Sequence, residues 1–405
     1  MTIQMVTVAQ ATTLSPAESS VAPVSFESLA RVGEAWESPG AAAFDFRSDI
    51  CTVQQPAILR AIIEAGANDR WTTNGASKFE AEMAQLTGRN ASIFKISSIM
   101  GNQVALRTHV ATPPYSVLCD TRSHLVHMEA GGVGSWSGAM LFTVTPSNGL
   151  WLNLEDIQRY AVISDGRDAC ACPTRVLHLE VPLGGIVMPL GELTRICHWA
   201  RENSIKVHLD GARLWEAVVS GAGTLHEYCK LPDSINLCLT KGLGGAVGSI
   251  LAGDKAFIGQ ARWVKKTVGG SMRQPGFVAA AAAAAVKLTW GKSIDGSDSL
   301  LGPCHERAAH LAKVWADHGG RLLCPQQTNM LWIDLDQAGI EEDEWESEGQ
   351  KRGLQLHGSR IIVHFRQAKT RSPLNHRVPR NESVSRVALS MQETWARRSV
   401  EVEDY

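Results

Sequence analysis

The sequence predicts an α/β protein, with a larger domain built on a mostly parallel sheet and a smaller C-terminal α+β domain. Between residues 44 and about 302, short apolar runs alternate with helical patterns, which is typical of a parallel sheet with helices on both faces. After this region the order changes, because one helix is followed by two strands and a terminal helix. The 405 residues are enough for two or three domains of ordinary size.

The strands of the larger domain are predicted from composition and length. Five apolar runs of four to six residues have the length of buried strands. A helical pattern at 190–203, which begins after Pro189, separates two of these strands. The five predicted strands are residues 92–96, 116–119, 176–179, 205–209 and 234–239.

Two flanking regions complete this outline. Residues 1–43 are rich in Ala, Ser, Thr, Val and Pro and lack periodicity, so we expect a mobile N-terminal arm. A Ser-, Gly- and Asp-rich stretch at 291–302 ends the larger domain, which we place at 44–302. The smaller domain, 303–405, is expected to contain a helix at 304–318, strands at 330–335 and 360–365, and a helix near 382–398.

Composition excludes several functional classes. The 39 Lys and Arg residues nearly balance 41 Asp and Glu, and no basic stripe with interleaved aromatic residues favours nucleic acid. The longest apolar run, 277–286, is mostly alanine and too short to span a membrane. No charged segment followed by an apolar one opens the chain, so we expect a cytoplasmic protein. The nine cysteines lack metal-ligand spacing, which predicts free thiols and no metal site.

An acid and a lysine at two predicted strand ends indicate a cofactor. Asp210 lies in the run 207–213, and an acid at a strand end can hold a protonated pyridine nitrogen. Lys241 lies in the glycine-rich run 237–245, and a lysine there can form an imine with an aldehyde. Together these are the two anchors that pyridoxal phosphate requires. Taken separately, they fit a charged loop and a capping lysine better.

Three more segments supply candidate contacts for such a cofactor. Ser98, Ile99 and Met100 open a predicted helix directly after a strand, where backbone N–H groups can bind a phosphate. His124 follows the next strand, and its imidazole can stack on a cofactor ring. Arg273 lies in a Gly- and Ser-containing segment and is a candidate phosphate ligand. Each feature alone fits an ordinary helix cap, a loop histidine or a surface charge.

Two arginine-containing segments are candidates for binding a substrate carboxylate. Ser48 lies between Arg47 and Asp49 at the start of the ordered region, and Arg360 begins a strand of the smaller domain. A guanidinium group can bind a carboxylate through two parallel hydrogen bonds. The alternative is that both arginines are surface charges.

Taken in order, these motifs resemble the threonine aldolase family of fold-type I pyridoxal phosphate enzymes. The resemblance covers about residues 44 to 366, and the combination is far more specific than any single motif. The motifs are Phe46-Arg47-Ser48-Asp49, Ser98-Ile99-Met100-Gly101-Asn102, Ser123-His124, Glu129-Ala130-Gly131-Gly132, His208-Leu209-Asp210-Gly211-Ala212-Arg213, Lys241-Gly242-Leu243-Gly244 and Gly269-Gly270-Ser271-Met272-Arg273-Gln274.

The resemblance implies a role for each cofactor candidate. Lys241 would carry the cofactor as a Schiff base, Asp210 would contact the pyridine nitrogen, and His124 would stack over the ring. The backbone at 98–100 would bind the phosphate, which Arg273 would reach from a neighbouring subunit. The family resemblance therefore implies a homodimer or homotetramer with active sites at the subunit interface.

The resemblance also implies the chemistry of the substrate. Ser48, Arg213 and Arg360 would hold the carboxylate of a small amino acid. That amino acid would react at Cα through an external aldimine and a quinonoid. The bond that stands perpendicular to the ring breaks, and the carboxylate contacts set this alignment.

Two segments depart from the family pattern near the substrate side chain. Residues 68–75 have lost most of the usual acids, and Val181 and Pro182 replace two polar residues before Leu183. Because racemisation needs no group for a β-hydroxyl, these changes favour a racemase. The resemblance to fungal members of the family implies an alanine racemase that supplies a D-amino acid for fungal peptide biosynthesis. The alternative is a low-specificity L-threonine aldolase that yields glycine and acetaldehyde. A non-catalytic scaffold would not need the imine lysine, Lys241.

Overall fold

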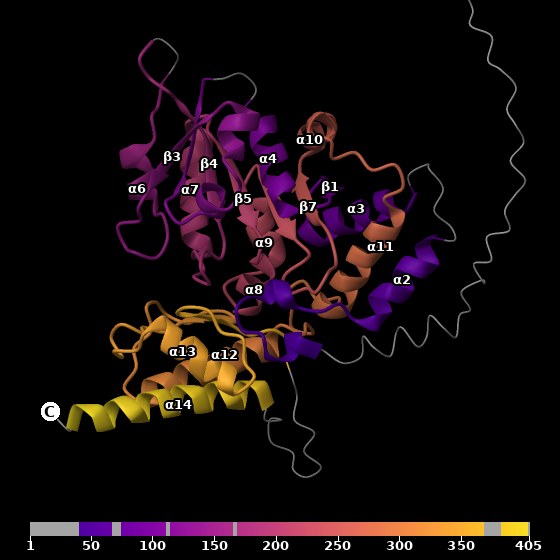
Figure 1. Cartoon of the computed structure of the whole chain (residues 1–405). Coiled ribbons are helices and arrows are strands. Elements are labelled where there is room, and N and C mark those ends of the chain that lie inside the picture. Colours follow the sequence, from indigo (N-terminus) through magenta and orange to yellow (C-terminus); the bar gives the residue numbers. More distant parts are fainter. Residues whose placement is uncertain (1–39, 67–73, 111–113, 165–167, 368–381, 404–405) are drawn as a thin grey trace, which may run out of the picture.

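The described part of the chain folds into alternating helices and strands (Figure 1). The structure is a computed structural model, and it describes residues 40–66, 74–110, 114–164, 168–367 and 382–403. The strands are β1 (Ala91–Lys95), β2 (Ser116–Asp120), β3 (Met140–Val144), β4 (Thr174–Glu180), β5 (Lys206–Gly211), β6 (Ser234–Cys238), β7 (Ser249–Gly253), β8 (Met330–Trp332) and β9 (Arg360–Ile362). The α-helices are α2 (Pro56–Gly66), α3 (Asn74–Thr87), α4 (Ser98–His109), α5 (His124–His127), α6 (Leu154–Tyr160), α7 (Leu190–Glu202), α8 (Leu214–Val219), α9 (Leu225–Lys230), α10 (Lys255–Thr267), α11 (Gly276–Ala285), α12 (Gly302–Asp317), α13 (Glu342–Lys351) and α14 (Glu382–Glu403). Short 3₁₀ or π segments lie at η1 (Gly40–Phe44), η2 (Asp49–Cys51), η3 (Val133–Ser137) and η4 (Val286–Trp290).

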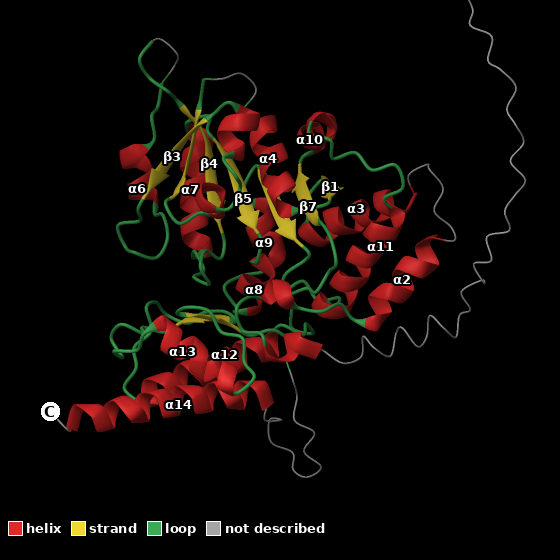
Figure 2. Ribbon diagram, viewed as in Figure 1, coloured by secondary structure: helices red, strands yellow, loops and turns green. Residues whose placement is uncertain are grey.

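A seven-stranded sheet forms the centre of the larger part of the molecule. Its strand order is β1-β7-β6-β5-β4-β2-β3. The five strands from β6 to β3 in this order run parallel, whereas β7 pairs antiparallel with both β1 and β6. The predicted mostly parallel sheet is therefore confirmed. Figure 2 shows the carboxyl ends of β4 and β5 pointing toward the smaller domain.

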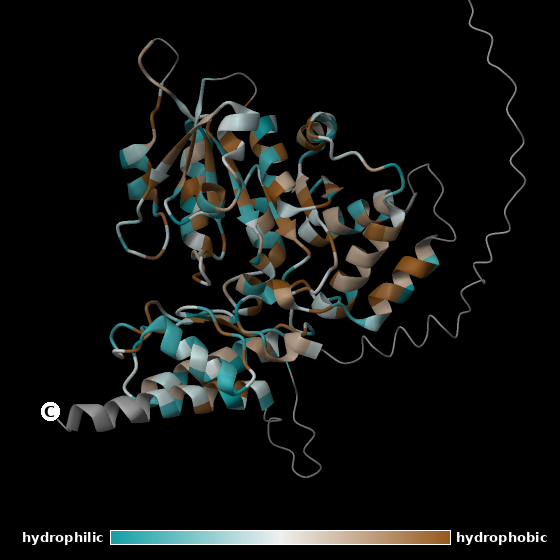
Figure 3. Cartoon of the chain, viewed as in Figure 1, coloured by the Kyte–Doolittle hydropathy of each residue, from teal (hydrophilic) through white to brown (hydrophobic). Residues whose placement is uncertain are grey.

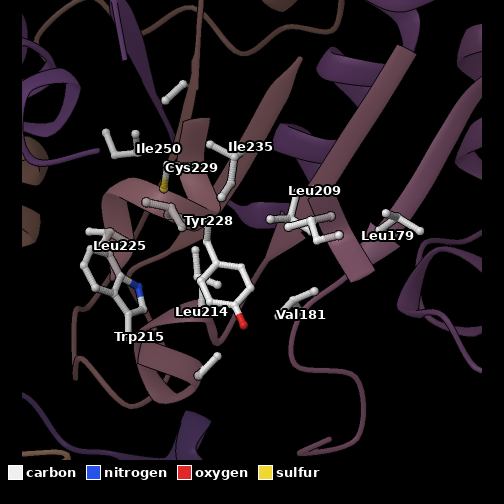
Figure 4. Close-up of a cluster of buried hydrophobic side chains, with 14 of the residues drawn as sticks. Leu179, Val181, Leu209, Leu214, Trp215, Leu225, Tyr228, Cys229, Ile235 and Ile250 are labelled. Atoms are coloured by element: carbon white, nitrogen blue, oxygen red, sulfur yellow. The ribbon is translucent and has the colours of Figure 1, made fainter. Parts of the chain in front are cut away.

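Helices cover both faces of the sheet because successive strand residues point to opposite sides. On one face, Ile93 of β1 and Leu251 of β7 pack with apolar residues of α4 and α10. On the other face, Phe94 and Ile250, their neighbours in sequence, join the main apolar core. Leu209 of β5 lies in the same core (Figure 4). This two-sided burial explains why these strands are nearly continuous apolar runs in the sequence.

The strand predictions are confirmed for five of the seven strands of this sheet. Their bounds agree within two residues with β1, β2, β4, β5 and β6. The sequence did not predict β3, which lies at the sheet edge and has only Val144 fully buried. It also did not predict β7, a short run that begins with Ser249 and ends with Gly253. Both strands nevertheless contain apolar runs, residues 140–142 in β3 and 250–252 in β7, of the length found in β2, and these runs were overlooked.

A second apolar core holds the smaller domain together. It joins residues of α12, α13 and α14 with the antiparallel pair β8 and β9. The helices predicted at 304–318 and near 382–398 and the strands predicted at 330–335 and 360–365 all contribute residues to this core. Phe46 also lies in this core, and its backbone N–H donates to the carbonyl of Gln355 (2.9 Å). The sequence placed Phe46 in the larger domain, but its side chain and its backbone N–H contact residues of the smaller domain, far along the sequence. The predicted boundary between residues 302 and 303 stays a prediction.

The described chain begins before the predicted end of the N-terminal arm. Residues 40–43 belong to η1, and Ala42 and Ala43 are buried. The mobility of the predicted arm, 1–43, stays a prediction. Residues 1–39 lie outside the described residues.

Most of the described helices carry both polar and apolar residues (Figure 3), whereas α11 consists of Gly, Phe, Val and Ala alone. Among these helices, none combines the length and the apolar composition that crossing a membrane requires.

We predict that Leu209→Ala lowers the free energy of unfolding by about 2–5 kcal/mol, because the smaller side chain leaves a cavity in the main core. Leu209 is fully buried in a central strand, whereas Leu323 is 57% exposed. Leu323→Ala is the matched control and should change stability by about 0.5 kcal/mol or less. Urea denaturation of both variants measures the difference. Equal losses in the two variants would contradict the assignment of this core.

Candidate active site

Asp210 lies near the carboxyl end of β5, the edge at which parallel sheets form ligand sites. Its side chain is buried, and both of its oxygens accept hydrogen bonds. Oδ1 accepts from the backbone N–H of Ala212 (2.9 Å), and Oδ2 accepts from Nδ2 of Asn102 (2.7 Å). Two donors from different elements fix the orientation of this carboxylate, which is what a contact to a pyridine nitrogen requires.

A buried carboxylate holds His124 at the start of α5. Nδ1 of His124 lies 3.0 Å from Oε1 of Glu129, which also accepts from Nδ2 of Asn102 (2.8 Å). Nε2 of Gln103 donates to the other oxygen of Glu129 (2.7 Å). The hydrogen bond to Glu129 raises the pKa of His124. Burial alone would raise the pKa of Glu129, but the hydrogen bonds from His124, Asn102 and Gln103 lower it, so Glu129 is a charged partner.

Lys241 lies in a tight turn that follows β6, the parallel neighbour of β5. The backbone N–H of Gly244 donates to the Lys241 carbonyl (2.7 Å), and Gly244 has φ +69°, a conformation that favours glycine. A Cβ at Gly245 would lie 2.3 Å from the carbonyl oxygen of Leu239. The glycines therefore permit the turn, and Lys241 lines a narrow pocket together with Arg213.

The first turn of α4 has the features of a phosphate site. The helix is 12 residues long and directly follows β1, with Ser97 as its N-cap. The hydroxyl of Ser98 is buried and has no hydrogen-bond partner among the described residues. Ile99 is 41% exposed, and a Cβ at Gly270 would lie 2.6 Å from Sδ of Met100. The segment that carries the exposed Arg273 therefore passes beside this helix end within the same chain.

The three predicted carboxylate ligands meet at the segment Arg47–Asp49. Ser48 caps η2 by accepting from the backbone N–H of Ile50 (3.4 Å). Nη2 of Arg360 donates to the carbonyl of Arg47 (3.0 Å). Nε and Nη2 of Arg213 both donate to the buried carboxylate of Asp49. Their use as carboxylate ligands stays a prediction, but the structure brings all three together.

The ion pair between Asp49 and Arg213 is buried and fully charged. Burial alone would raise the pKa of Asp49, but the charge and hydrogen bonds of Arg213 lower it. Burial alone would lower the pKa of Arg213, but Asp49 raises it well above its ordinary value. The guanidinium group is thereby held rigidly at the edge of the pocket that it shares with Lys241.

Glu180 is a site residue that the sequence analysis did not single out. It ends β4 and is paired in register with Asp210 of β5, so both side chains point to the same face of the sheet. One of its oxygens accepts from the backbone N–H of His124 (3.0 Å). Burial and the neighbouring charge of Asp210 raise the pKa of Glu180 to about 7. Its carboxyl group can therefore bind or release a proton near neutral pH.

The alternation of side chains between the two faces of β4 corrects the prediction for Val181. Val181 follows Glu180 and points to the opposite face, where it is fully buried in the main core (Figure 4). It cannot line the pocket for a substrate side chain, as its place in the sequence motif suggested. Leu183, two residues further, is half-buried and lines a hollow together with Glu180. The other departing segment, 68–75, lies mostly outside the described residues.

The residues present fit pyridoxal phosphate. Asp210 offers a fixed carboxylate, His124 an oriented ring, the N-terminus of α4 an unpartnered hydroxyl, and Lys241 an amine. Among the described residues, no group of three or more His, Cys, Asp or Glu side chains has the arrangement of a metal site. Asn102 and Glu129 lie inside the sequence motifs of the family resemblance, but their supporting roles were not predicted.

Residues 45–338, which contain most of this site, match the family of beta-eliminating lyases. The chain belongs to the beta-eliminating lyase family. Within this family, it is 46% identical over 335 residues to the aldolase vrtJ of Penicillium aethiopicum, covering 82% of this chain and 84% of the relative.

Two further relatives carry different activities in their names. The chain is 40% identical over 332 residues to alanine racemase TOXG of Cochliobolus carbonum, covering 82% of this chain and 85% of the relative. It is 38% identical to the low-specificity L-threonine aldolase of Eremothecium gossypii, covering 81% of this chain and 85% of the relative. The predicted membership of the threonine aldolase group is therefore confirmed.

Solved structures of the family confirm the predicted fold class. The threonine aldolase of Leishmania major superposes with a TM-score of 0.70 at 19% identity, covering 87% of this chain and 99% of the other. At that identity the likeness establishes the fold alone. The fold-type I arrangement predicted from the sequence is confirmed.

We predict that Glu180→Gln changes how stability depends on pH. The pKa of Glu180 is raised from 4.5 to about 7, so the folded protein binds this proton more tightly than the unfolded chain. Its contribution to stability is complete below about pH 4.5 and is lost as the pH rises through about 7. The stability of the variant relative to the unsubstituted protein should therefore rise across this interval, as measured by urea denaturation. A difference that does not change with pH would contradict the burial of Glu180 beside Asp210.

Proposed function

We propose that this chain is a pyridoxal phosphate-dependent lyase that cleaves the Cα–Cβ bond of a small β-hydroxy amino acid such as threonine. The prediction of an amino-acid enzyme with this cofactor is confirmed by the family match and by relatives of 38–46% identity. The observation that carries the proposed site is the pair of fixed groups, Asp210 and His124, at the sheet edge where Lys241 follows the neighbouring strand.

The bound cofactor would withdraw electrons from the substrate Cα. Asp210 would keep the pyridine nitrogen protonated, and the hydrogen bonds from Asn102 and Ala212 hold its carboxylate in place for this contact. Lys241 would supply the amine that binds the cofactor and then exchanges protons at the substrate. Arg213 and Arg360 would hold the substrate carboxylate and so select the bond that breaks.

The lyase reaction is placed first because the structure weakens the argument for a racemase. Val181 was predicted to lie at the pocket for the substrate side chain, but it is buried in the core. The other support for a racemase, the altered segment at 68–75, lies mostly outside the described residues. Glu180 meanwhile provides an ionisable carboxyl group on the face of the sheet that carries Asp210. The relative with 46% identity is an aldolase by name.

Alanine racemisation is the second candidate. The relative of 40% identity is named an alanine racemase, and the half-buried Leu183 lines the hollow beside Glu180 with an apolar side chain. His124 and Lys241 would then exchange protons with Cα from opposite sides of the ring. A supply of D-alanine for peptide biosynthesis would follow from this reaction.

The assembly and the location of the enzyme are also proposals. We expect a homodimer or homotetramer in which Arg273 reaches the phosphate of a neighbouring subunit, and we expect it in the cytoplasm. The exposure of Arg273 leaves this side chain available for such a contact.

The two reactions are separated by one pair of incubations. With L-threonine, we predict formation of glycine and acetaldehyde, at least about tenfold faster than D-alanine forms from L-alanine in deuterium oxide. Chiral amino-acid analysis and mass spectrometry measure both products. Lys241→Ala is the control and should abolish either reaction by a factor of a thousand or more, on the order expected for loss of a nucleophile. Deuterated D-alanine without acetaldehyde from threonine would establish the racemase instead.

A further inference from the structure

The side chain of Asn102 is fully buried, and all of its hydrogen-bonding positions are filled. Its Nδ2 group donates to Oδ2 of Asp210 (2.7 Å) and to Oε1 of Glu129 (2.8 Å). Its Oδ1 atom lies 3.0 Å from Nδ2 of Asn236 and 3.2 Å from Nε2 of His208. An amide has two donor hydrogens and two acceptor positions, so no further partner is possible. One side chain therefore contacts both the acid at the pyridine site and the carboxylate that orients His124.

The orientation of this amide is forced by its surroundings. Two carboxylate oxygens, from Asp210 and Glu129, face Nδ2, and carboxylates only accept hydrogen bonds when ionised. A rotation by 180° would place Oδ1 against both carboxylates and Nδ2 against the amide group of Asn236. Oδ1 must therefore accept, and Nε2 of His208 must carry a hydrogen.

A chain of neutral groups supports this arrangement from behind. Burial lowers the pKa of His208 well below its ordinary value, so with Nε2 protonated its Nδ1 is an acceptor. The hydroxyl of Ser234 lies 2.8 Å from Nδ1 of His208 and 2.7 Å from Nε2 of His109, and burial lowers the pKa of His109 to about 4. The hydrogen bonds then run in one direction, from His109 through Ser234 and His208 to Asn102. Hydrogen bonds aligned in this way polarise and strengthen one another.

We propose that Asn102 is a positioning residue that holds Asp210 and, through Glu129, His124 in place with the two hydrogens of one amide. The two groups that would contact the cofactor ring from different directions are thereby fixed to a common support. Loss of Asn102 would release both contacts at once, whereas loss of Gln103, which bonds to Glu129 alone, would release only the second. This inference rests on the proposed function, since it assumes that these groups face pyridoxal phosphate.

The test measures how the protein binds the cofactor and whether the ring nitrogen is protonated, and it does not measure catalytic turnover. Apoprotein is combined with pyridoxal phosphate labelled with ¹⁵N in the ring, and two quantities are recorded: the dissociation constant by fluorescence and the ¹⁵N chemical shift of the ring. With Asn102→Leu, we expect the dissociation constant to rise about ten- to a hundredfold, as for a lost hydrogen bond to a charged group. We also expect the ring nitrogen to shift toward its unprotonated form, because Asp210 keeps only the backbone N–H of Ala212 as a donor and its Oδ2 is no longer held.

Gln103→Leu is the matched control. It should weaken binding less, and it should leave the ¹⁵N shift of the unsubstituted protein unchanged, because Asp210 keeps its partners. Asn102→Ala removes both donor hydrogens without adding a charge, so it serves if the leucine variant fails to fold. It should move the ring nitrogen in the same direction. An unchanged ¹⁵N shift in a folded Asn102 variant, or an equal shift in Gln103→Leu, would overturn the inference.

The same experiment distinguishes this inference from the proposed function. If the unsubstituted protein binds the cofactor with a protonated ring nitrogen and the Asn102 variants do the same, only the positioning role fails. If the unsubstituted protein does not bind pyridoxal phosphate, the proposed function and the inference fail together.

Discussion

A carboxylate buried at the end of a strand is costly unless donors satisfy its oxygens, and this constraint organises the site around Asp210. One of the two donors to Asp210 is Asn102, which stands on α4, 108 positions earlier in the sequence. The same amide reaches Glu129 and, on its other side, contacts β5 and β6 through His208 and Asn236. The helix that offers its N-terminus to a phosphate is thus fixed to the strand that offers Asp210.

A second buried interaction connects the site to the smaller domain. Asp49 pairs with Arg213, while Phe46, three residues before Asp49, lies in the core of the smaller domain. Arg360 of β9 donates to the carbonyl of Arg47 in the same segment. Removing one partner of such a pair leaves a charge buried without compensation, which typically costs about 3–5 kcal/mol. The segment that carries Ser48 is therefore held from both domains, as a group that orients a substrate must be.

The features that depend on a single strand or turn could be predicted from the sequence. Buried strands such as β5 are continuous apolar runs, and the turn at Lys241 needs glycine at Gly244 and Gly245, so each left a local signal. Asp210 and Lys241 could be predicted because each follows a strand and has a side chain suited to the cofactor. The edge strand β3 was not predicted although it too contains an apolar run, residues 140–142, so the local signal was present there as well.

The sequence did not predict the features that depend on how strands and helices pack against one another. Val181 was expected in the pocket, but the register of β4 against β5 turns it to the core and presents Glu180 instead. The residue types of Val181 and Glu180 do not by themselves reveal which face of the sheet each side chain will occupy. Asn102 stood inside a recognised motif, but its role depends on Glu129, Asp210 and two further strand residues that only the fold brings together.

The account as a whole depends on Lys241 as the residue that binds the cofactor. The most direct measurement is reduction of the cofactor-loaded protein with sodium borohydride, followed by peptide mass spectrometry to locate the pyridoxyl group. The account predicts a single modified peptide containing Lys241, and no such modification in Lys241→Ala. A pyridoxyl group on another lysine, such as the fully buried Lys95, or an unmodified protein, would contradict it.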